Sequence, residues 1–215
     1  MAKRAEYLGP ERRRPMVLDA ALEIFAEGGF ADASMQAIAE RAGVSKAVLY
    51  DCFPGGKQEI YYALLERGEE KFMDHMRAVL ERTARLPLDE GLRQGLRAFL
   101  EYAEIHPHSF QVIFGEPGTR DPEVARRTER AREQIVGLMR QRTQDITRAA
   151  GLEMGPLWDV YPRVTVAVAE EIARWLLREP QVPRDTVVEM IVLWFMKGYE
   201  QIIPNEAWRG TRVLD

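Results

Sequence analysis

The 215-residue chain lacks several features on which whole classes of protein depend. It has a single cysteine, so no disulfide can form within the chain, and this favours a reducing compartment. We expect Cys52 to be a small core residue, with a redox-sensing thiol as the alternative. No apolar run is long enough to span a membrane, and the first twenty residues are too polar and basic for a signal peptide. These absences predict a cytoplasmic protein with no membrane partner.

Catalytic and cofactor-binding motifs are absent as well. The sequence contains no GxSxG, HExxH, P-loop or GxGxxG pattern. Only three histidines occur, and neither cysteine nor paired carboxylates accompany His106 and His108 at the spacing of metal ligands. We interpret these two histidines as polar residues of a turn. The sequence therefore predicts no enzyme, no cofactor and no metal site.

Basic charge is scarce. The formal net charge is −4, which argues against a protein whose whole surface binds nucleic acid. Residues 1–60 contain eight Lys and Arg against nine Asp and Glu, and the only dense basic cluster lies at residues 12–14. Because arginine is unfavourable at a helix N-terminus, a phosphate contact explains this cluster better than a solvated helix start. Any DNA-binding surface must depend on where a few cations are placed.

The most informative pattern that is present is a helix-turn-helix at residues 34–53. Ser34 and Ser45 each precede a helical repeat of apolar residues, as N-caps do. Gly43 supplies the tight turn between the two predicted helices, and the small side chain of Ala39 lets them approach closely. In such a motif the second helix enters the major groove of DNA and the first crosses the backbone.

Proline and glycine breaks divide the chain into helical segments, and strand signals are almost absent. We therefore predict an all-α fold of about nine helices. Their expected ranges are 11–28, 35–41, 45–52, 57–84, 88–105, 107–114, 121–150, 156–178 and 184–203.

Several positions of different chemistry also occur in a fixed order over roughly fifty residues. They are Ala20-Ala21, Phe25, Gly29-Phe30, Ile38-Ala39, Ala42-Gly43-Val44-Ser45, Leu49-Tyr50, Phe53 and Lys57. This pattern resembles the TetR family of bacterial transcriptional regulators. The resemblance implies a three-helix DNA-binding domain at residues 1–56 and a helical ligand-binding and dimerisation domain at residues 57–215. It also implies a homodimer that binds an operator in double-stranded DNA.

The residues expected to contact DNA lie at the starts of predicted helices and on the second helix of the motif. Lys46 can reach base edges or phosphate, Tyr50 can donate its hydroxyl to phosphate, and Lys57 can neutralise a phosphate. Ala47 and Val48 present small apolar surfaces that suit a thymine methyl group. The full predicted set is Arg12, Arg13, Arg14, Ser34, Met35, Ser45, Lys46, Ala47, Val48, Tyr50 and Lys57.

The last two predicted helices are apolar over much of their circumference. Within residues 187–196 only Glu189 is charged, and a helix that is apolar on several sides must be buried on several sides. One side can face the chain's own core, so the other predicts a second protein surface. The expected homodimer interface consists of Val187, Met190, Ile191, Trp194 and Phe195. A wholly internal core helix in a monomer is the alternative.

Aromatic residues are numerous between residues 88 and 178. Each one alone is compatible with ordinary core packing, but as a set they predict an apolar pocket with a few polar groups. The resemblance implies an effector site in the same region. The predicted ligand-binding residues are Phe99, Tyr102, Phe110, Phe114, Trp158, Tyr161 and Trp175.

Together these features predict a homodimeric repressor that an apolar or aromatic small molecule releases from a palindromic operator. The ligand would act by favouring a separation of the two recognition helices that does not match the DNA. Two alternatives stay open. One is control of the same DNA-binding fold by a protein partner, and the other is an enzyme with an incidental helix-turn-helix.

Overall fold

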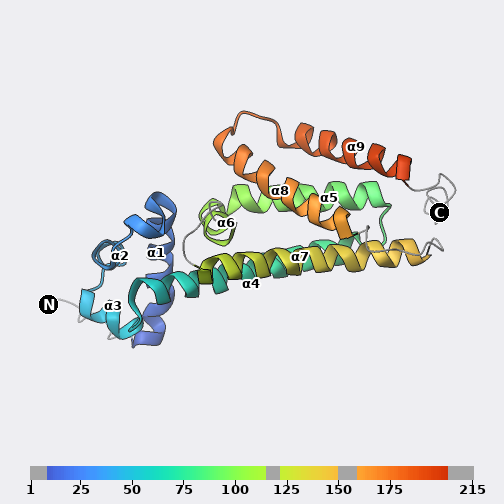
Figure 1. Cartoon of the computed structure of the whole chain (residues 1–215). Helices are drawn as coiled ribbons and strands as arrows, with labels where there is room; N and C mark the ends of the chain where they lie inside the picture. Colours follow the sequence, from blue (N-terminus) through green and yellow to red (C-terminus); the bar gives the residue numbers. More distant parts are fainter. Residues whose placement is uncertain (1–8, 115–121, 150–158, 203–215) are drawn as a thin grey trace. The chain divides into compact units, whose positions relative to one another are not determined.

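The computed structural model describes residues 9–114, 122–149 and 159–202 (Figure 1). Within these ranges the chain forms nine α-helices and no strand, which confirms the all-α prediction. The helices are α1 Pro10–Asp32, α2 Met35–Arg41, α3 Lys46–Cys52, α4 Gly56–Thr83, α5 Leu88–Ile105, α6 Pro107–Phe114, α7 Pro122–Ala149, α8 Val160–Arg178 and α9 Arg184–Ile202.

The break predicted at Gly28-Gly29 is present as a kink within α1. Helical structure resumes after the kink and ends at Asp32, whereas the expected helix ended at residue 28. At the kink Gly29 leaves the helical conformation, with φ 69° and ψ 178°, a combination that is essentially restricted to glycine. The turn after Gly29 places the ring of Phe30 against Phe25 and Tyr61, with centroids 5.9 and 5.1 Å apart, respectively.

The chain divides into two compact units. Unit 1 consists of residues 1–70 and 108–127, and unit 2 consists of residues 71–107 and 128–215. Helices α4 and α7 each belong partly to both units, because the divisions fall within their lengths. The domain boundary expected after residue 56 stays a prediction.

Unit 1 has a closed apolar core beneath α1, α2 and α3. Ile38, Leu49 and Phe53 are fully buried, and Val17 and Phe25 of α1 belong to the same cluster. Helix α1 contacts both α2 and α3, so the three helices form one small group (Figure 1). Burial of each such side chain contributes about 1.5–3 kcal/mol, and this packing fixes the orientation of α3.

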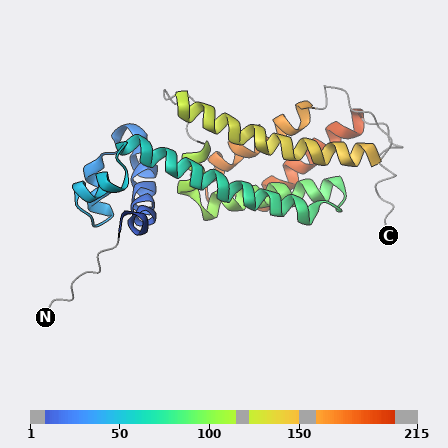
Figure 2. The same ribbon diagram turned by 90° about the horizontal axis from the view of Figure 1, so that it is seen from below.

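In unit 2, α5 packs against α8 and α9. The ring of Phe72 in α4 also meets the rings of Phe99 and Tyr102 in α5, with centroids 5.4 and 5.0 Å away. Figure 2 shows the helices of this unit lying alongside one another as a bundle. The interior of the unit is therefore enclosed by helices that are distant in sequence.

The part of the chain that the structure describes shows neither a helix suited to span a membrane nor a cluster of metal-binding side chains. None of its helices is both long and apolar enough to cross a membrane. The same residues contain no group of three or more His, Cys, Asp or Glu side chains placed to hold a metal ion.

Candidate functional site

The connection between α2 and α3 has the geometry of a helix-turn-helix. The amide of Val44 donates to the carbonyl of Ala39 at 3.0 Å, and the amide of Gly43 donates to Glu40 at 3.1 Å. Gly43 has φ 66°, which a residue with a Cβ adopts only with strain. Ala39 is buried, and its methyl group leaves room for α3 to contact α2.

Two serine caps fix where α2 and α3 begin. The hydroxyl oxygen of Ser34 accepts from the amide of Ala37 at 3.1 Å, and that of Ser45 accepts from Val48 at 3.3 Å. Both serines are exposed. Since a hydroxyl that accepts a bond still carries its own hydrogen, each cap can also donate to a phosphate oxygen.

The exposed residues of α3 are Lys46, Ala47, Tyr50 and Asp51, so its outer face has both a cation and a carboxylate. Leu49 and Cys52 point the other way and are buried in the core of unit 1. Burial raises the pKa of the Cys52 thiol, so this cysteine has the character of a core residue. The exposed face of α3 is therefore the surface available to a DNA groove.

Two other predicted DNA contacts are less accessible. Val48 is half-buried, and Met35, the first residue of α2, is only 9% exposed. The side chain of Met35 belongs to the same apolar cluster as Ile38 and Leu49. Its contribution to this region is therefore packing beneath the motif.

The basic cluster at residues 12–14 is only partly free for DNA. Its first arginine is exposed and its second is half-buried. Arg14 donates from Nη1 to the carbonyl of Cys52 at 2.5 Å, and its guanidinium lies 4.2 Å from the ring centroid of Phe53. It also lies 3.5 Å from the carboxylate of Glu59. Arg14 thus joins α1 to the C-terminal end of α3 and to α4.

Lys57 is also engaged within unit 1. Its ammonium donates to the carbonyls of Phe30, Ala31 and Ala33 at 2.7, 3.3 and 2.8 Å. It also lies 4.5 Å from the ring centroid of Phe30. An ammonium group has three hydrogens, and these three carbonyls at the end of α1 can use all of them.

Unit 2 encloses a cavity of about 60 Å³ between α4, α5, α7 and α8. A single water needs roughly 10–15 Å³ measured in this way, so the space holds a few waters or a small apolar group. Most of its wall is aliphatic. The lining residues are Met76, Leu80, Leu88, Gly91, Leu92, Gly95, Leu96, Phe99, Ile135, Met139, Arg142, Thr143, Tyr161, Thr165, Val166 and Ala169.

Of the predicted ligand-binding aromatic residues, Phe99 and Tyr161 line this cavity. Tyr102 is buried beside it in the core, with its ring 4.8 Å from that of His106. The remaining four do not line it: Phe110 and Phe114 are buried in unit 1, Trp175 is on the surface, and Trp158 lies outside the described residues.

Arg142 was not among the predicted residues, although it is the one charged side chain that the described residues contribute to the cavity wall. A signal for it exists in α7, because Arg142 follows Ile135 and Met139 at helical spacing and so falls on the inward stripe of that helix. Because many residues around Arg142 in α7 are also charged, its position on the inward side of the helix did not stand out in the sequence.

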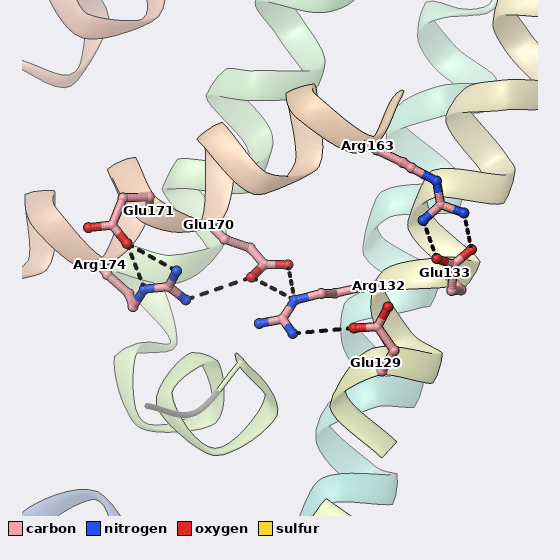
Figure 3. A network of polar contacts seen from close by, with 7 residues as sticks. All are labelled: Glu129, Arg132, Glu133, Arg163, Glu170, Glu171 and Arg174. Carbon is pink, nitrogen blue, oxygen red and sulfur yellow. Dashed lines mark hydrogen bonds and ion pairs between the residues drawn. The ribbon is translucent and has the colours of Figure 1, made fainter. Parts of the chain in front are cut away.

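A network of ion pairs joins α7 to α8 (Figure 3). Glu170 is 2% exposed, and both of its carboxylate oxygens accept from Nε of Arg132 at 2.9 Å. Arg174 approaches the same carboxylate at 3.7 Å. Burial raises the pKa of Glu170, and the two guanidinium groups oppose that shift. The outer pairs of the network are Arg132–Glu129, Arg174–Glu171 and Arg163–Glu133.

Helices α8 and α9 expose a set of large apolar side chains. Trp194 is 67% exposed, Leu193 56% and Met190 47%. Val187 and Ile191, which were also predicted to form an interface, are buried within the chain's own core. Phe195 is half-buried, and its ring packs edge-on against Tyr161 with centroids 5.7 Å apart.

Three large apolar residues of α8 outside the predicted interface are exposed as well. They are Val160, Val164 and Trp175. Along α9, the spacing of Met190, Leu193 and Trp194 places these three side chains on one helical face. Exposed apolar side chains grouped in this way are typical of protein interaction surfaces.

Comparison with known proteins places this arrangement in a family. Residues 17–64 match the family model of the bacterial regulatory proteins, tetR family. The HTH-type transcriptional activator FasR of Mycolicibacterium smegmatis is 30% identical over 201 residues, covering 93% of this chain and 89% of that protein.

Solved structures share the fold. The fatty acid degradation regulator FadR from Bacillus halodurans superposes with a TM-score of 0.72 at 15% identity, covering 92% of this chain and 99% of that one. The regulator FadR from Bacillus subtilis, solved in complex with stearoyl-CoA, gives a TM-score of 0.68 at 16% identity and covers 83% of this chain and 95% of that one.

Proposed function

Since this chain belongs to the TetR family of DNA-binding transcriptional regulators, we propose that it acts as a homodimeric repressor whose operator binding is controlled by a small molecule. The family is one of regulators and not of enzymes. The observation that carries the proposal is the combination of an exposed α3 surface in unit 1 with a mostly apolar cavity in unit 2.

The proposed DNA-reading surface is centred on Lys46, Ala47 and Tyr50. Lys46 begins α3, where it reaches either a guanine edge or a phosphate, and the hydroxyl of Tyr50 donates to phosphate. The caps Ser34 and Ser45 add hydroxyl donors at two helix N-termini, which favour anions. Arg12 and Arg13 supply further phosphate contacts. For Arg14, Lys57 and Met35 we propose a supporting role, because their side chains are engaged within unit 1.

The proposed dimer forms through the exposed apolar face of α8 and α9. Met190, Leu193 and Trp194 of α9 and Trp175 of α8 are its expected centre, because large aromatic and Met side chains dominate stable interfaces. Two copies of unit 1 would then meet two half-sites of a palindromic operator.

The proposed effector enters the cavity of unit 2 and carries an apolar chain. The stearoyl-CoA complex of the Bacillus subtilis regulator, and the fatty acid role in the name of the Bacillus halodurans one, support an acyl group. A cavity of about 60 Å³ holds only part of such a chain, so binding requires α4, α5, α7 and α8 to separate. Helix α4 runs from unit 1 into unit 2, so its displacement by a ligand would change the position of the DNA-binding helices. Control by a protein partner stays the alternative, because the cavity in its present form holds only a few waters.

Selection of bound fragments from a random DNA pool tests the DNA-binding proposal. The full-length protein should enrich a palindrome, and Lys46→Ala should weaken binding to it. Lys71→Ala, which removes an exposed lysine of unit 2, is the matched control and should bind as the wild type does. Recovery of no common sequence would reject the operator.

Activation is a second candidate for the direction of control, because the relative FasR is named as an activator. Deletion of the gene distinguishes the two directions. Transcripts next to the selected operator should rise if the protein is a repressor, whereas a fall would identify an activator.

A further inference from the structure

The cavity of unit 2 contains a cation without a matching anion. Nη1 of Arg142 donates to the hydroxyl of Thr83 at 2.6 Å. Its Nη2 atom is buried from solvent and has no hydrogen-bond partner among the described residues. No carboxylate in those residues forms an ion pair with Arg142 either, in contrast to Arg132, which pairs with the buried Glu170.

An uncompensated guanidinium in an apolar wall is unfavourable. Burial lowers the pKa of Arg142, because loss of solvent penalises the charged form. Arginine stays protonated despite such a shift, so the positive charge remains in the cavity and an anion placed beside it would be bound strongly. The site therefore selects for negative charge at this point.

Space for the guanidinium depends on a glycine in the facing helix. A Cβ built on Gly91 of α5 would lie 1.9 Å from Nη2 of Arg142 and 2.8 Å from its Cζ. Such a separation is far inside van der Waals contact, so any side chain at this position would displace the head group. Glycine has poor helix propensity, yet Gly91 stands within α5 at the point that faces Arg142 of α7.

The charged group lies at one end of the cavity. The pairs Arg140–Asp159 at 2.7 Å and Arg132–Glu170 at 2.9 Å show that α7 and α8 run antiparallel. Arg142 contacts Thr83 at the end of α4, so it lies at the end of the bundle where α4 leads into α5.

The rest of the wall is apolar along the direction that leads away from Arg142. One helical turn away is Met139, and beyond it come Ile135, Phe99 and Ala169. The cavity therefore has a cationic end and an apolar end, which is the arrangement that binds an amphiphile.

We propose that the effector of this protein is a monocarboxylic acid with an apolar chain, whose carboxylate pairs with Arg142 and whose chain extends toward Phe99. This inference rests on the proposed effector site and names the chemical class that the site takes. The planar guanidinium matches the two oxygens of a carboxylate. A nucleotide thioester has several phosphates and a large head group, whereas this small cavity offers one cation.

Calorimetric titration of the full-length protein with octanoate, 1-octanol and octanoyl-CoA tests the inference. The acid and the alcohol share the chain length and differ in charge. Wild-type protein should bind octanoate roughly ten- to hundredfold more tightly than 1-octanol, the factor expected for a charge-assisted hydrogen bond. Arg142→Met should remove this preference and leave the affinity for 1-octanol within about threefold, because the chain contacts remain.

Two glycine variants separate the head group from the cavity. Gly91→Ala should also abolish the preference for the acid, because its methyl group displaces the guanidinium. Gly95→Ala adds the same methyl group to the same helix and cavity wall where no atom lies within 4 Å, and it should keep the preference. If Arg142→Met folds poorly, comparison of Gly91→Ala with Gly95→Ala still tests whether the guanidinium causes the preference for the acid.

The outcomes that overturn the inference are distinct. Equal wild-type affinity for acid and alcohol, or a preference that survives both Arg142→Met and Gly91→Ala, would reject the carboxylate site and leave the effector cavity intact. Tighter binding of octanoyl-CoA than of octanoate, lost in Arg142→Met, would assign the anion to the phosphates of a thioester. Failure of all three compounds to bind would reject the effector cavity itself.

Discussion

The two units are both built from α-helices, but their interiors are packed differently. In unit 1, Leu49 and Phe53 are fully buried in a closed core, and Arg14 and Lys57 fix the ends of helices by hydrogen bonds to carbonyl groups. In unit 2, the helices enclose a cavity, and the guanidinium of Arg142 has an unsatisfied nitrogen in its wall. The interior of unit 1 is closed and its cations are hydrogen-bonded, whereas the interior of unit 2 contains a guanidinium nitrogen without a partner among the described residues.

This difference suits the two tasks that we propose for the protein, which are binding DNA and binding an effector. Reading base edges requires α3 to hold its side chains in one arrangement, since each contact depends on hydrogen-bond geometry. A sensor needs two arrangements whose populations a ligand shifts by its different affinity for each. A closed core suits the first task, and a bundle of helices around a cavity suits the second.

The largest expected effect compares the same deletion in the two interiors. Leu49→Ala in the closed core should cost about 4–5 kcal/mol of unfolding free energy, because it creates a new cavity. Leu96→Ala should cost about 2–3 kcal/mol, because Leu96 already borders a cavity and so loses fewer contacts. Urea unfolding followed by circular dichroism measures both changes. Equal costs would mean that unit 2 is as tightly packed as unit 1.

Local signals in the sequence account for the parts that could be predicted. Capping by Ser34 and Ser45 and the turn at Gly43 each depend on residues within a few positions in the sequence. The helix-turn-helix could therefore be predicted from the sequence alone. Proline and glycine breaks likewise placed the helices, and the all-α class is confirmed. The kink in α1 likewise falls at Gly29, within the predicted break.

Properties that depend on distant residues could not be read in this way. The bond between Arg142 and Thr83 joins helices far apart in the sequence, and a cavity is the space that side chains fail to fill. Helix α9 illustrates the same limit. Its sequence is apolar over much of its circumference, and only packing against α5 shows that Ile191 faces inward while Trp194 faces outward.

The second prediction concerns this outward face. Trp194→Glu should raise the dimer dissociation constant at least about 30-fold, as expected when a central interface aromatic is lost. Ile105→Glu, which changes an exposed apolar residue of α5 outside the face, is the matched control and should dimerise normally. Sedimentation equilibrium measures both. If the wild type is a monomer at micromolar concentration, the dimer proposal fails.

The third prediction separates two lysines of unit 1. Lys57→Met should destabilise the protein by about 1–3 kcal/mol, since three carbonyls lose a charged donor, and should leave the salt dependence of DNA binding unchanged. Lys46→Met should change stability by less than about 0.5 kcal/mol and reduce the salt slope by roughly 0.9 per subunit, if it contacts phosphate. A smaller salt slope in Lys57→Met would show that this lysine reaches DNA after all.

The smallest effect is expected from the outer face of α5, beside the glycine that makes room for Arg142. Glu90 accepts from Gln94 at 2.8 Å and from Arg93 at 2.6 Å, and these hydrogen bonds lower its pKa. A lowered pKa in the folded state stabilises the protein above the unfolded value, about 4.3, and this stabilisation is lost as the pH falls through the folded value. The gain should be less than about 1 kcal/mol, because the pair is partly exposed.

Unfolding free energies measured between pH 6 and roughly pH 3 test this sign. The loss of stability toward acid should be shallower in Glu90→Gln than in the wild type, because the variant has no proton to take up at this position. Gln94→Ala should give an intermediate curve, since Arg93 still donates to the carboxylate. Identical curves for all three proteins would show that the paired carboxylate on the outside of α5 contributes nothing, in contrast to the unpaired cation on its inside.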